Sequence, residues 1–428
     1  MEKSLPFTAA AARRWTETVP TPFYVYDAAG ITAGIKALKA AFSWNKGFRE
    51  YFAVKATPTP GVLRLLTAED CGTDCASVPE LTLSRAVGLQ GDHIVLTSNE
   101  TSPEEYRAAL AAGAIVNFDD LTQIDLCVAA AGVPETVCVR YNPGEFRISN
   151  AIIGTLKESK FGMPEDQLTQ ALARLKALGA KRFGVHGMLA SCSLDPAYYP
   201  ELARVLFSLA VRIKDRLGIE LSFIDLSGGI GIPYKPEEKP VDIVAVGAAV
   251  RAVYAEILTP AGLSPALYTE LGRWATGPHG YLITSVIGHK HTHKEYVGVD
   301  ATACCLMRPA IYGAYHHITV LGKETQAPAG VFDVVGSLCE NNDKFAVDRP
   351  LPETKLGDLL AIHDAGAHGR SMGYNYNGKL RPAEYLLRAD GFLECVRRAE
   401  TQADLFATLD ADEVFTAALS RLAGEAKI

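Results

Sequence analysis

The order of hydrophobic and polar positions divides the chain into two parts. Between residues 50 and 272, short β-branched or aromatic runs alternate with longer segments of helical period, which predicts repeated βα units. Eight such units are typical of a (β/α)8 TIM barrel. An open doubly wound sheet is the alternative, but it favours a glycine fingerprint after its first strand, which this sequence lacks. The eight predicted strands cover residues 51–55, 71–77, 93–98, 114–119, 136–142, 182–189, 221–227 and 266–272.

The C-terminal part of the chain has the alternating pattern of strands. The first 29 residues contain FYVYD, a run that could supply one more strand to this part. The sequence therefore predicts an α/β protein in which residues 30–275 form the barrel and residues 1–29 and 276–428 form a β-rich domain. The strands predicted for the second domain cover residues 280–288, 296–301, 310–321, 331–337 and 358–366, followed by a hairpin at 385–398.

Composition and charge narrow the class of partner. With 48% hydrophobic and 21% charged residues the chain has a globular composition, and its formal net charge of -7 offers no basic stripe for nucleic acid. No run of about eighteen apolar residues could span a bilayer. The nine cysteines lack the paired spacings of zinc sites, so no metal site is expected. We therefore expect a cytoplasmic protein with a small-molecule partner, without a role at a membrane.

A lysine at the end of the first predicted strand is the first candidate for chemistry. In a TIM barrel the reactive residues come from the C-terminal ends of the strands. Lys55 ends YFAVK, and a lysine at the mouth of an apolar strand can lose solvation and form a Schiff base. The alternative is a strand-end lysine that only extends its amine to solvent.

Two further strand ends carry suitable groups. SGGIG at 227–231 follows the seventh strand, where barrels often bind phosphate through backbone amides, although a tight turn would use the same glycines. Glu270 and Arg273 follow the eighth strand. A carboxylate there could keep the ring nitrogen of pyridoxal phosphate (PLP) protonated, and a surface salt bridge is the alternative for this pair.

The sequence resembles the decarboxylases of the alanine racemase fold, most closely the diaminopimelate decarboxylase family, over nearly its whole length. Each matching segment is modest evidence by itself, but their order makes the resemblance specific. The segments are TPFYVYD, YFAVKATPTPGVLRLL, CASVPELTLSRAVG, KFGM, LSGGIGIPY, ELGR, MRPAIYGAYHHI, VVGSLCENND and GDLLAIHDAGAHGRSMGYNYNGKLRPAE.

The resemblance implies a PLP site in the barrel. Lys55 would carry the cofactor, Glu270 would face the pyridine nitrogen, and Gly228, Gly229 and Ser191 would help to hold the phosphate. The remaining positions expected at the cofactor are His186, Met188, Gly272, Arg273 and His368.

The resemblance also implies a substrate site that two subunits share. Cys339 would lie on a loop that enters the partner's site and would reprotonate Cα, with an inert core thiol as the alternative. Glu340 would recognise an amino group of the substrate. Arg273, Arg308 and Tyr312 would receive the substrate's distal carboxylate, because an arginine fork binds a carboxylate bidentately. For Arg308 a structural ion pair is the alternative.

The sequence departs from the family pattern at several positions. ELGR replaces EPGR, a change that we expect only to loosen a turn. Met188 stands where the family has a histidine that stacks on the cofactor ring, and His368 replaces a tyrosine. With the Asn341-Asn342 pair after Cys-Glu, these changes suggest a divergent subgroup.

The expected reaction is decarboxylation of meso-diaminopimelate to L-lysine and CO2, in lysine biosynthesis, by a homodimer. A decarboxylase of D-lysine or D-ornithine is the first alternative, although unpaired buried arginines would then be costly. A racemase of the same fold needs a second base at Cα and tends to lack the Cys-Glu loop. An inactive homologue that binds a regulatory protein partner is the alternative of another class, and intact Lys55, Glu270 and Cys339 oppose it.

Overall fold

The computed structural model describes residues 3–148, 154–410 and 412–425. The chain divides into two compact units, one formed by Ala28–His279 and the other by the segment up to Asp27 together with the chain from Gly280 onward. The borders predicted from the sequence lie between residues 29 and 30 and between residues 275 and 276. The observed borders lie between residues 27 and 28 and between residues 279 and 280.

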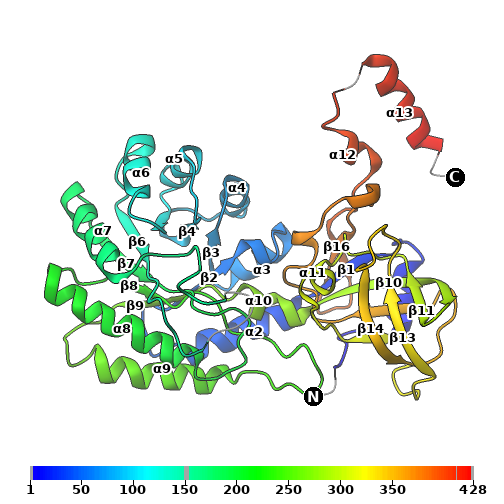
Figure 1. Ribbon diagram of the computed structural model, residues 1–428, viewed down its shortest axis with the longest axis horizontal. Coiled ribbons are helices and arrows are strands. Elements are labelled where there is room, and N and C mark those ends of the chain that lie inside the picture. The colour runs from blue at the N-terminus through cyan, green and yellow to red at the C-terminus, as the bar shows by residue number, and fades with distance from the viewer. Residues whose placement is uncertain (1–2, 149–153, 411, 426–428) are drawn as a thin grey trace. The chain divides into compact units, whose positions relative to one another are not determined.

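The first unit is a closed parallel barrel, which confirms the predicted fold class (Figure 1). Each strand pairs in parallel with the next, and the first pairs with the last through Arg49 opposite Tyr268. In the described part of the chain the barrel strands are β2 (Arg49–Ala53), β3 (Gly72–Cys75), β4 (Ile94–Thr97), β5 (Ile115–Phe118), β6 (Thr136–Arg140), β7 (Arg182–His186), β8 (Phe223–Asp225) and β9 (Ala266–Thr269).

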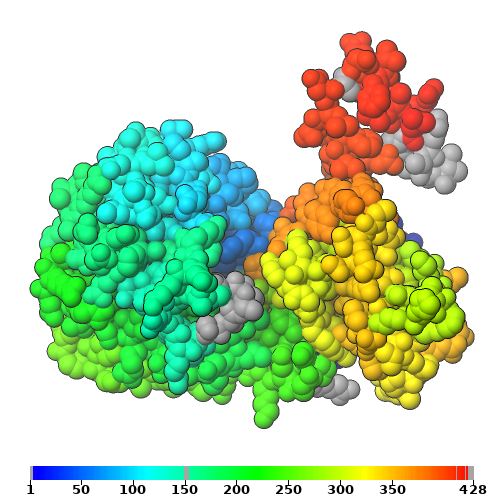
Figure 2. Space-filling model, viewed as in Figure 1, coloured from blue at the N-terminus to red at the C-terminus, as the bar shows by residue number. Residues whose placement is uncertain are grey.

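Helices surround the barrel, and Figure 2 shows the outer surface that α5 to α8 give to this unit. Their ends follow from local sequence. Ser102 and Glu105 form a capping box at the start of α5, and Gly179 ends α7 in the left-handed conformation. The helices are α2 (Ala28–Ala41), α3 (Pro60–Ala68), α4 (Val78–Ala86), α5 (Pro103–Ala111), α6 (Gln123–Ala131), α7 (Glu165–Leu178), α8 (Tyr198–Leu217), α9 (Ile243–Ile257) and α10 (Gly272–Thr276), with 3-10 turns η1 (Val54–Ala56), η2 (Gly91–His93) and η3 (Gly277–His279).

Large side chains fill the barrel interior. The rings of Tyr51 and Phe223 lie 4.8 and 4.6 Å from the ring of Tyr268, and Val95, Ile115 and Cys138 join the same buried cluster. Because the interior is packed rather than open, a bound molecule must lie at the strand ends.

The second unit is built on a mixed sheet of nine strands, as far as the described residues show. β1 lies between β10 and β16, antiparallel to the first and parallel to the second, so the N-terminal FYVYD does supply a strand. The sheet order is β14-β13-β11-β10-β1-β16-β17, and β15 pairs with β10 and β12. The strands are β1 (Phe23–Asp27), β10 (Gly280–His291), β11 (Glu295–Val299), β12 (Ile318–Val320), β13 (Gly330–Val335), β14 (Lys344–Leu351), β15 (Leu359–Ile362), β16 (Ala383–Leu387) and β17 (Leu393–Arg397).

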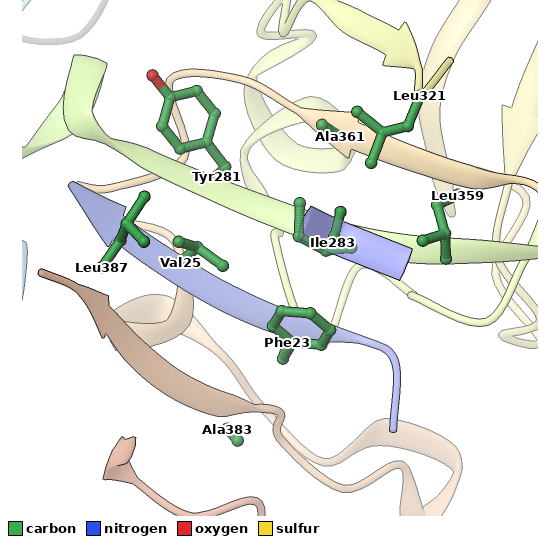
Figure 3. Packing of buried hydrophobic residues seen from close by; sticks show 10 residues of the cluster. Phe23, Val25, Tyr281, Ile283, Leu321, Leu359, Ala361, Ala383 and Leu387 are labelled. Atoms are coloured by element: carbon green, nitrogen blue, oxygen red, sulfur yellow. The ribbon is translucent and has the colours of Figure 1, made fainter. Parts of the chain in front are cut away.

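The core of the second unit brings together strands that are far apart in sequence. Phe23 and Val25 of β1 belong to one buried cluster with Ile283 of β10, Ala361 of β15 and Leu387 of β16 (Figure 3). The burial of β1 therefore joins the N-terminal segment to the C-terminal half of the chain.

The structure corrects several predictions for this unit. The strand predicted at 310–321 is reduced to β12, because Arg308–Tyr312 form the short helix α11, with proline near its start and Gly313 in the left-handed conformation at its end. The sequence did not predict β14. It also did not predict the helices α1 (Ala9–Thr16), α12 (Gln402–Phe406) and α13 (Glu413–Glu425), or the 3-10 turns η4 (Arg370–Met372) and η5 (Tyr376–Gly378).

The structure also shows the state of the cysteines and the character of the helices. The nine cysteines are free thiols, and six of them are buried. Among the described helices, none combines the length and the apolar character needed to cross a membrane.

Candidate active site

Lys55 and Asp74 form an ion pair at the C-terminal ends of the first two barrel strands. β2 ends at Ala53, and Lys55 lies in the 3-10 turn that follows, so the prediction that Lys55 itself ends the strand was wrong. Its Nζ donates a hydrogen bond to Oδ2 of Asp74 over 2.7 Å. The side chain of Lys55 is half exposed and that of Asp74 is fully buried. A buried carboxylate thus holds this amine in place. A lysine that only extended its amine into solvent would have no such partner.

The electrostatics of this pair favour a charged amine. Burial acts to lower the pKa of Lys55, but attraction to Asp74 and Glu270 outweighs it and keeps the pKa above its usual value. Burial, together with repulsion from Glu270, raises the pKa of Asp74. The contact with Asp74 therefore holds the Lys55 side chain as an ammonium.

Glu270, which follows β9, lies in a buried hydrogen-bond network. Its Oε2 accepts a hydrogen bond of 2.7 Å from the Ser227 hydroxyl and lies 3.2 Å from Nε2 of His186. Burial acts to raise the pKa of Glu270, but His186, Lys55 and Ser227 together lower it to about 2. Glu270 is therefore an anion at neutral pH, and its burial excludes a surface salt bridge as its role.

The glycines after β8 are required by close packing of the backbone. Ser227 and Gly229 have φ angles of 54° and 105°. A Cβ on Gly228 would lie 2.8 Å from the carbonyl oxygen of Glu270, and one on Gly229 would lie 2.5 Å from the ring of Tyr198. The glycines therefore allow a close approach of backbone at a bend of the chain, and their role toward phosphate stays a prediction.

The loop that contains Ser191 is paired with this turn. The backbone N–H of Ser193 donates to the carbonyl of Gly229 over 2.8 Å, and the N–H of Gly231 donates back to the carbonyl of Ser193 over 2.7 Å. Ser191 lies two residues before Ser193. Backbone hydrogen bonds thus join the loop after β7 to the loop after β8.

Met188 lies beside the Glu270 network. Its Sδ is 3.4 Å from the hydroxyl oxygen of Ser227, which is already directed at Glu270 over 2.7 Å. The thioether is an apolar contact for this hydroxyl and cannot donate a hydrogen bond itself. His186, two residues earlier, directs its Nε2 toward Oε2 of Glu270.

Gly272 and Arg273 lie at the start of α10, next to the turn that carries Lys55. A Cβ on Gly272 would lie 2.8 Å from the Cβ of Ala56, so only glycine allows this approach. Arg273 donates a hydrogen bond of 2.7 Å to the hydroxyl of Tyr234.

Arg308 of α11 is a buried cation of the second unit, 5% exposed. Its Nη1 donates to Nε2 of His316 over 2.8 Å, while Nδ1 of His316 bonds to the carbonyl of His363 over 2.8 Å. Because Nδ1 of His316 faces this carbonyl, Nε2 is the nitrogen that accepts from Arg308. Tyr312, at the end of α11, is 57% exposed.

Cys339 lies on an exposed loop of the second unit that is firmly tied at its base. Its backbone N–H donates to Oδ1 of Asn377 over 2.7 Å. The buried carboxylate of Asp343 accepts from the N–H of Leu338 over 2.8 Å. Cys339 and Glu340 are both exposed, so the alternative of an inert core thiol is wrong.

His368 follows β15 and has a φ angle of 54°. The next residue is glycine because a Cβ on Gly369 would lie 2.5 Å from the carbonyl oxygen of Ala365.

The predicted site residues divide between the two units. The barrel brings together Lys55, His186, Met188, Ser191, Gly228, Gly229, Glu270, Gly272 and Arg273, and the second unit carries Arg308, Tyr312, Cys339, Glu340 and His368.

Sequence reasoning missed several polar residues of the barrel site. Asp74, Ser227 and Asp225 contact or support the groups described above, and the N–H of Ser227 donates to Asp225 over 2.7 Å. Asp74 lies within the predicted strand 71–77 and Asp225 within 221–227. A systematic search for carboxylates near strand ends could have found both.

The barrel residues fit PLP. Oε1 of Glu270 is buried and has no hydrogen-bond partner among the described residues, although an unsatisfied buried carboxylate oxygen is costly. A protonated ring nitrogen is a suitable donor for this atom. Lys55 provides an amine at the same strand ends, and the turn at Gly228 leaves no room for side chains.

Comparisons with known proteins agree with this chemistry. A model described as the pyridoxal binding domain of pyridoxal-dependent decarboxylases matches residues 29–277. Protein TabA of Pseudomonas amygdali pv. tabaci is 44% identical over 93% of this chain and 94% of its own. The diaminopimelate decarboxylase of Methanothermobacter thermautotrophicus is 36% identical over 90% of both chains. The crystal structure of diaminopimelate decarboxylase from M. jannaschii in complex with L-lysine aligns with a TM-score of 0.86 at 30% identity, covering 94% of both chains.

Proposed function

Because the chain belongs to the pyridoxal-dependent decarboxylases, we propose that it removes CO2 from the D-centre of meso-diaminopimelate and so forms L-lysine. The observation that carries this choice of substrate is the buried guanidinium of Arg308, held in place by His316. A fixed arginine fork is suited to a carboxylate, and meso-diaminopimelate has one at the end remote from the reacting carbon. The similarity to proteins named diaminopimelate decarboxylase supports the same choice.

The cofactor of this enzyme is PLP. When bound, it supplies an electron sink for the electron pair that remains at the substrate Cα after CO2 departs. Lys55 would hold it through the amine, and Gly228, Gly229 and Ser191 would hold its phosphate. His186, Met188 and Gly272 would complete its surroundings in the barrel, and the family resemblance assigns His368 to the cofactor as well.

Glu270 would hold the proton on the ring nitrogen. Its pKa of about 2 keeps the carboxylate charged at neutral pH, so its free Oε1 can accept from the ring nitrogen. Asp74 would orient the amine of Lys55. The two groups form an ion pair of 2.7 Å, which fixes the position of the nitrogen at the strand ends.

Cys339 would return a proton to Cα in the active site of the partner subunit of a homodimer. An exposed thiol on a loop anchored by Asn377 suits this role, because its position is defined while the sulfur stays accessible. Glu340, next to it, would receive an amino group of the substrate. The family resemblance assigns Arg273 and Tyr312, like Arg308, to recognition of the distal carboxylate.

Decarboxylation of D-lysine or D-ornithine is the second candidate function. Met188 and His368 replace residues usual in diaminopimelate decarboxylases, and the name of Protein TabA, which is 44% identical, states no substrate. An inactive regulatory homologue is a weaker candidate. It would have no need for the Lys55–Asp74 pair or for the buried network at Glu270.

We expect Arg308→Gln to lower kcat/KM for meso-diaminopimelate by about a hundredfold, because a charged hydrogen-bond pair to the carboxylate is lost. CO2 release from D-lysine, which has no distal carboxylate, should change less than about threefold. Steady-state CO2 release with both substrates measures this difference. Arg308→Lys keeps the charge without the fork and serves as a second variant if Arg308→Gln fails to fold.

Arg398→Gln is the matched control, because it removes an arginine of the same unit whose side chain is 67% exposed. Its rates should equal those of the unmodified protein. Equal losses with both substrates in the folded Arg308 variants would contradict recognition of a distal carboxylate by Arg308.

A further inference from the structure

Glu50 is a buried carboxyl group of β2 that the proposed reaction does not use. It is 1% exposed and lies opposite Thr269 of β9 in the barrel register. The Thr269 hydroxyl lies 2.5 Å from its Oε2, and the backbone N–H of Leu271 donates to its Oε1 over 2.6 Å. One side chain thus ties the strand that leads to Lys55 to the segment that carries Glu270.

The segment from Glu270 to Gly272 forms a closed turn. Leu271 has φ and ψ angles of -84° and 59°, and the N–H of Gly272 donates to the carbonyl of Glu270 over 3.0 Å, as in an inverse γ-turn. The N–H of Glu270 donates to the carbonyl of Ser227 over 2.8 Å. The turn is thus closed with leucine at this position, and the expectation that ELGR loosens it relative to EPGR stays a prediction.

The leucine and the glutamate depend on one another. Proline, which the related EPGR segment has at this position, carries no N–H, whereas Leu271 brings a donor into a site where it is 1% exposed. A buried N–H without an acceptor is costly, and Glu50 supplies the acceptor. The side chain of Glu50 thus compensates for the loss of proline and restrains the same turn.

The surroundings of Glu50 keep it neutral. Burial, with repulsion from Glu270 and Asp74, raises its pKa to about 8 against the lowering effect of its two hydrogen bonds. Asp225, Tyr199 and Cys71 also interact with it, and all three are acidic groups. A neutral Glu50 can satisfy Thr269 and Leu271 without adding a second negative charge beside Glu270.

We propose that Glu50 is a positioning residue that, through the N–H of Leu271, fixes the direction in which Glu270 meets the ring nitrogen of the cofactor. The inference rests on the proposed role of Glu270. It predicts that the loss of Glu50 weakens recognition of the ring nitrogen in particular, and not merely the stability of the barrel.

Recognition of the ring nitrogen can be measured with the carbon analogue of PLP in which CH replaces that nitrogen. The experiment determines how much analogue displaces half of the bound PLP from the full-length holoenzyme. The unmodified protein should prefer PLP by at least about tenfold, because only PLP can donate a charged hydrogen bond to Glu270. Glu270→Ala should reduce this preference to about one.

Three variants separate positioning from stability. Glu50→Leu should reduce the preference to less than about threefold, because the unsatisfied N–H of Leu271 disturbs the turn. Glu50→Gln keeps a neutral acceptor and should retain the full preference. The double variant Glu50→Leu with Leu271→Pro should restore it, because proline has no N–H and the φ of -84° at this position is close to that of proline.

The outcomes separate the inference from the proposed function. If Glu270→Ala removes the preference but Glu50→Leu and its double variant both retain it, Glu50 is only structural and the inference is overturned. The inference would also be overturned if the double variant did not regain the preference for PLP that Glu50→Leu loses. A preference near one in the unmodified protein would refute the role of Glu270 itself, and with it the inference.

Discussion

Lys55→Ala should lower kcat by at least about a thousandfold and abolish the visible absorbance of covalently bound cofactor. Lys55 is the amine at the strand ends whose ammonium contacts Asp74 over 2.7 Å. Alanine would remove the proposed covalent attachment together with the ion pair to Asp74. The fold should persist, because half of the lysine side chain is exposed and its removal leaves no large cavity.

Two controls test this interpretation of Lys55. Lys46→Ala removes an exposed lysine near the start of β2 and should leave rate and absorbance unchanged. Added methylamine should partly restore turnover of Lys55→Ala, because it supplies the missing amine. A Lys55→Ala protein that keeps its activity and absorbance would show that another residue carries the cofactor.

Cys339→Ala should lower kcat for L-lysine formation by about a hundredfold while leaving the cofactor absorbance intact, because general acids typically contribute a factor of this size. The thiol is exposed on a loop fixed through Asn377, so alanine removes a proton donor without creating a cavity. Cys395→Ala is the matched control, since it removes the other exposed thiol of the second unit. Loss of the absorbance in Cys339→Ala would instead indicate a structural role.

Mixing two inactive variants tests whether Cys339 acts in the partner's active site. If sites are shared in a homodimer, hybrids of Lys55→Ala with Cys339→Ala contain one site with both residues intact. A statistical mixture should then recover about a quarter of the normal activity. Recovery of none, with dimers formed and exchanging, would place Cys339 in the site of its own chain.

The barrel was predictable because its signal is local. Most of the eight strands are short β-branched or aromatic runs between amphipathic segments. Seven of the predicted ranges contain an observed strand, and the first, 51–55, overlaps β2. The FYVYD strand was also predictable from its composition, although its place between β10 and β16 depends on residues more than 250 positions away. The short helix α11 was missed because the bulky residues around it give the pattern of a strand.

The site was less predictable because its contacts join different strands. Lys55 and Glu270 were identified from their places at strand ends and from the resemblance. The contacts of Lys55 with Asp74 and of Glu270 with Ser227 depend on which side chains face one another across the barrel. Glu50 was not anticipated, because its importance appears only when its register with Thr269 places it against the N–H of Leu271.

The most direct measurement is CO2 release by the purified PLP-loaded protein with meso-diaminopimelate, D-lysine, D-ornithine, L-lysine and L-ornithine at matched concentrations. The account predicts a clear preference for meso-diaminopimelate, with L-lysine as the product, because the proposed role of the buried Arg308 is to bind a second carboxylate. A preference for D-lysine or D-ornithine would contradict the proposed substrate. Absence of CO2 release from every substrate would contradict decarboxylation of these diamino acids altogether.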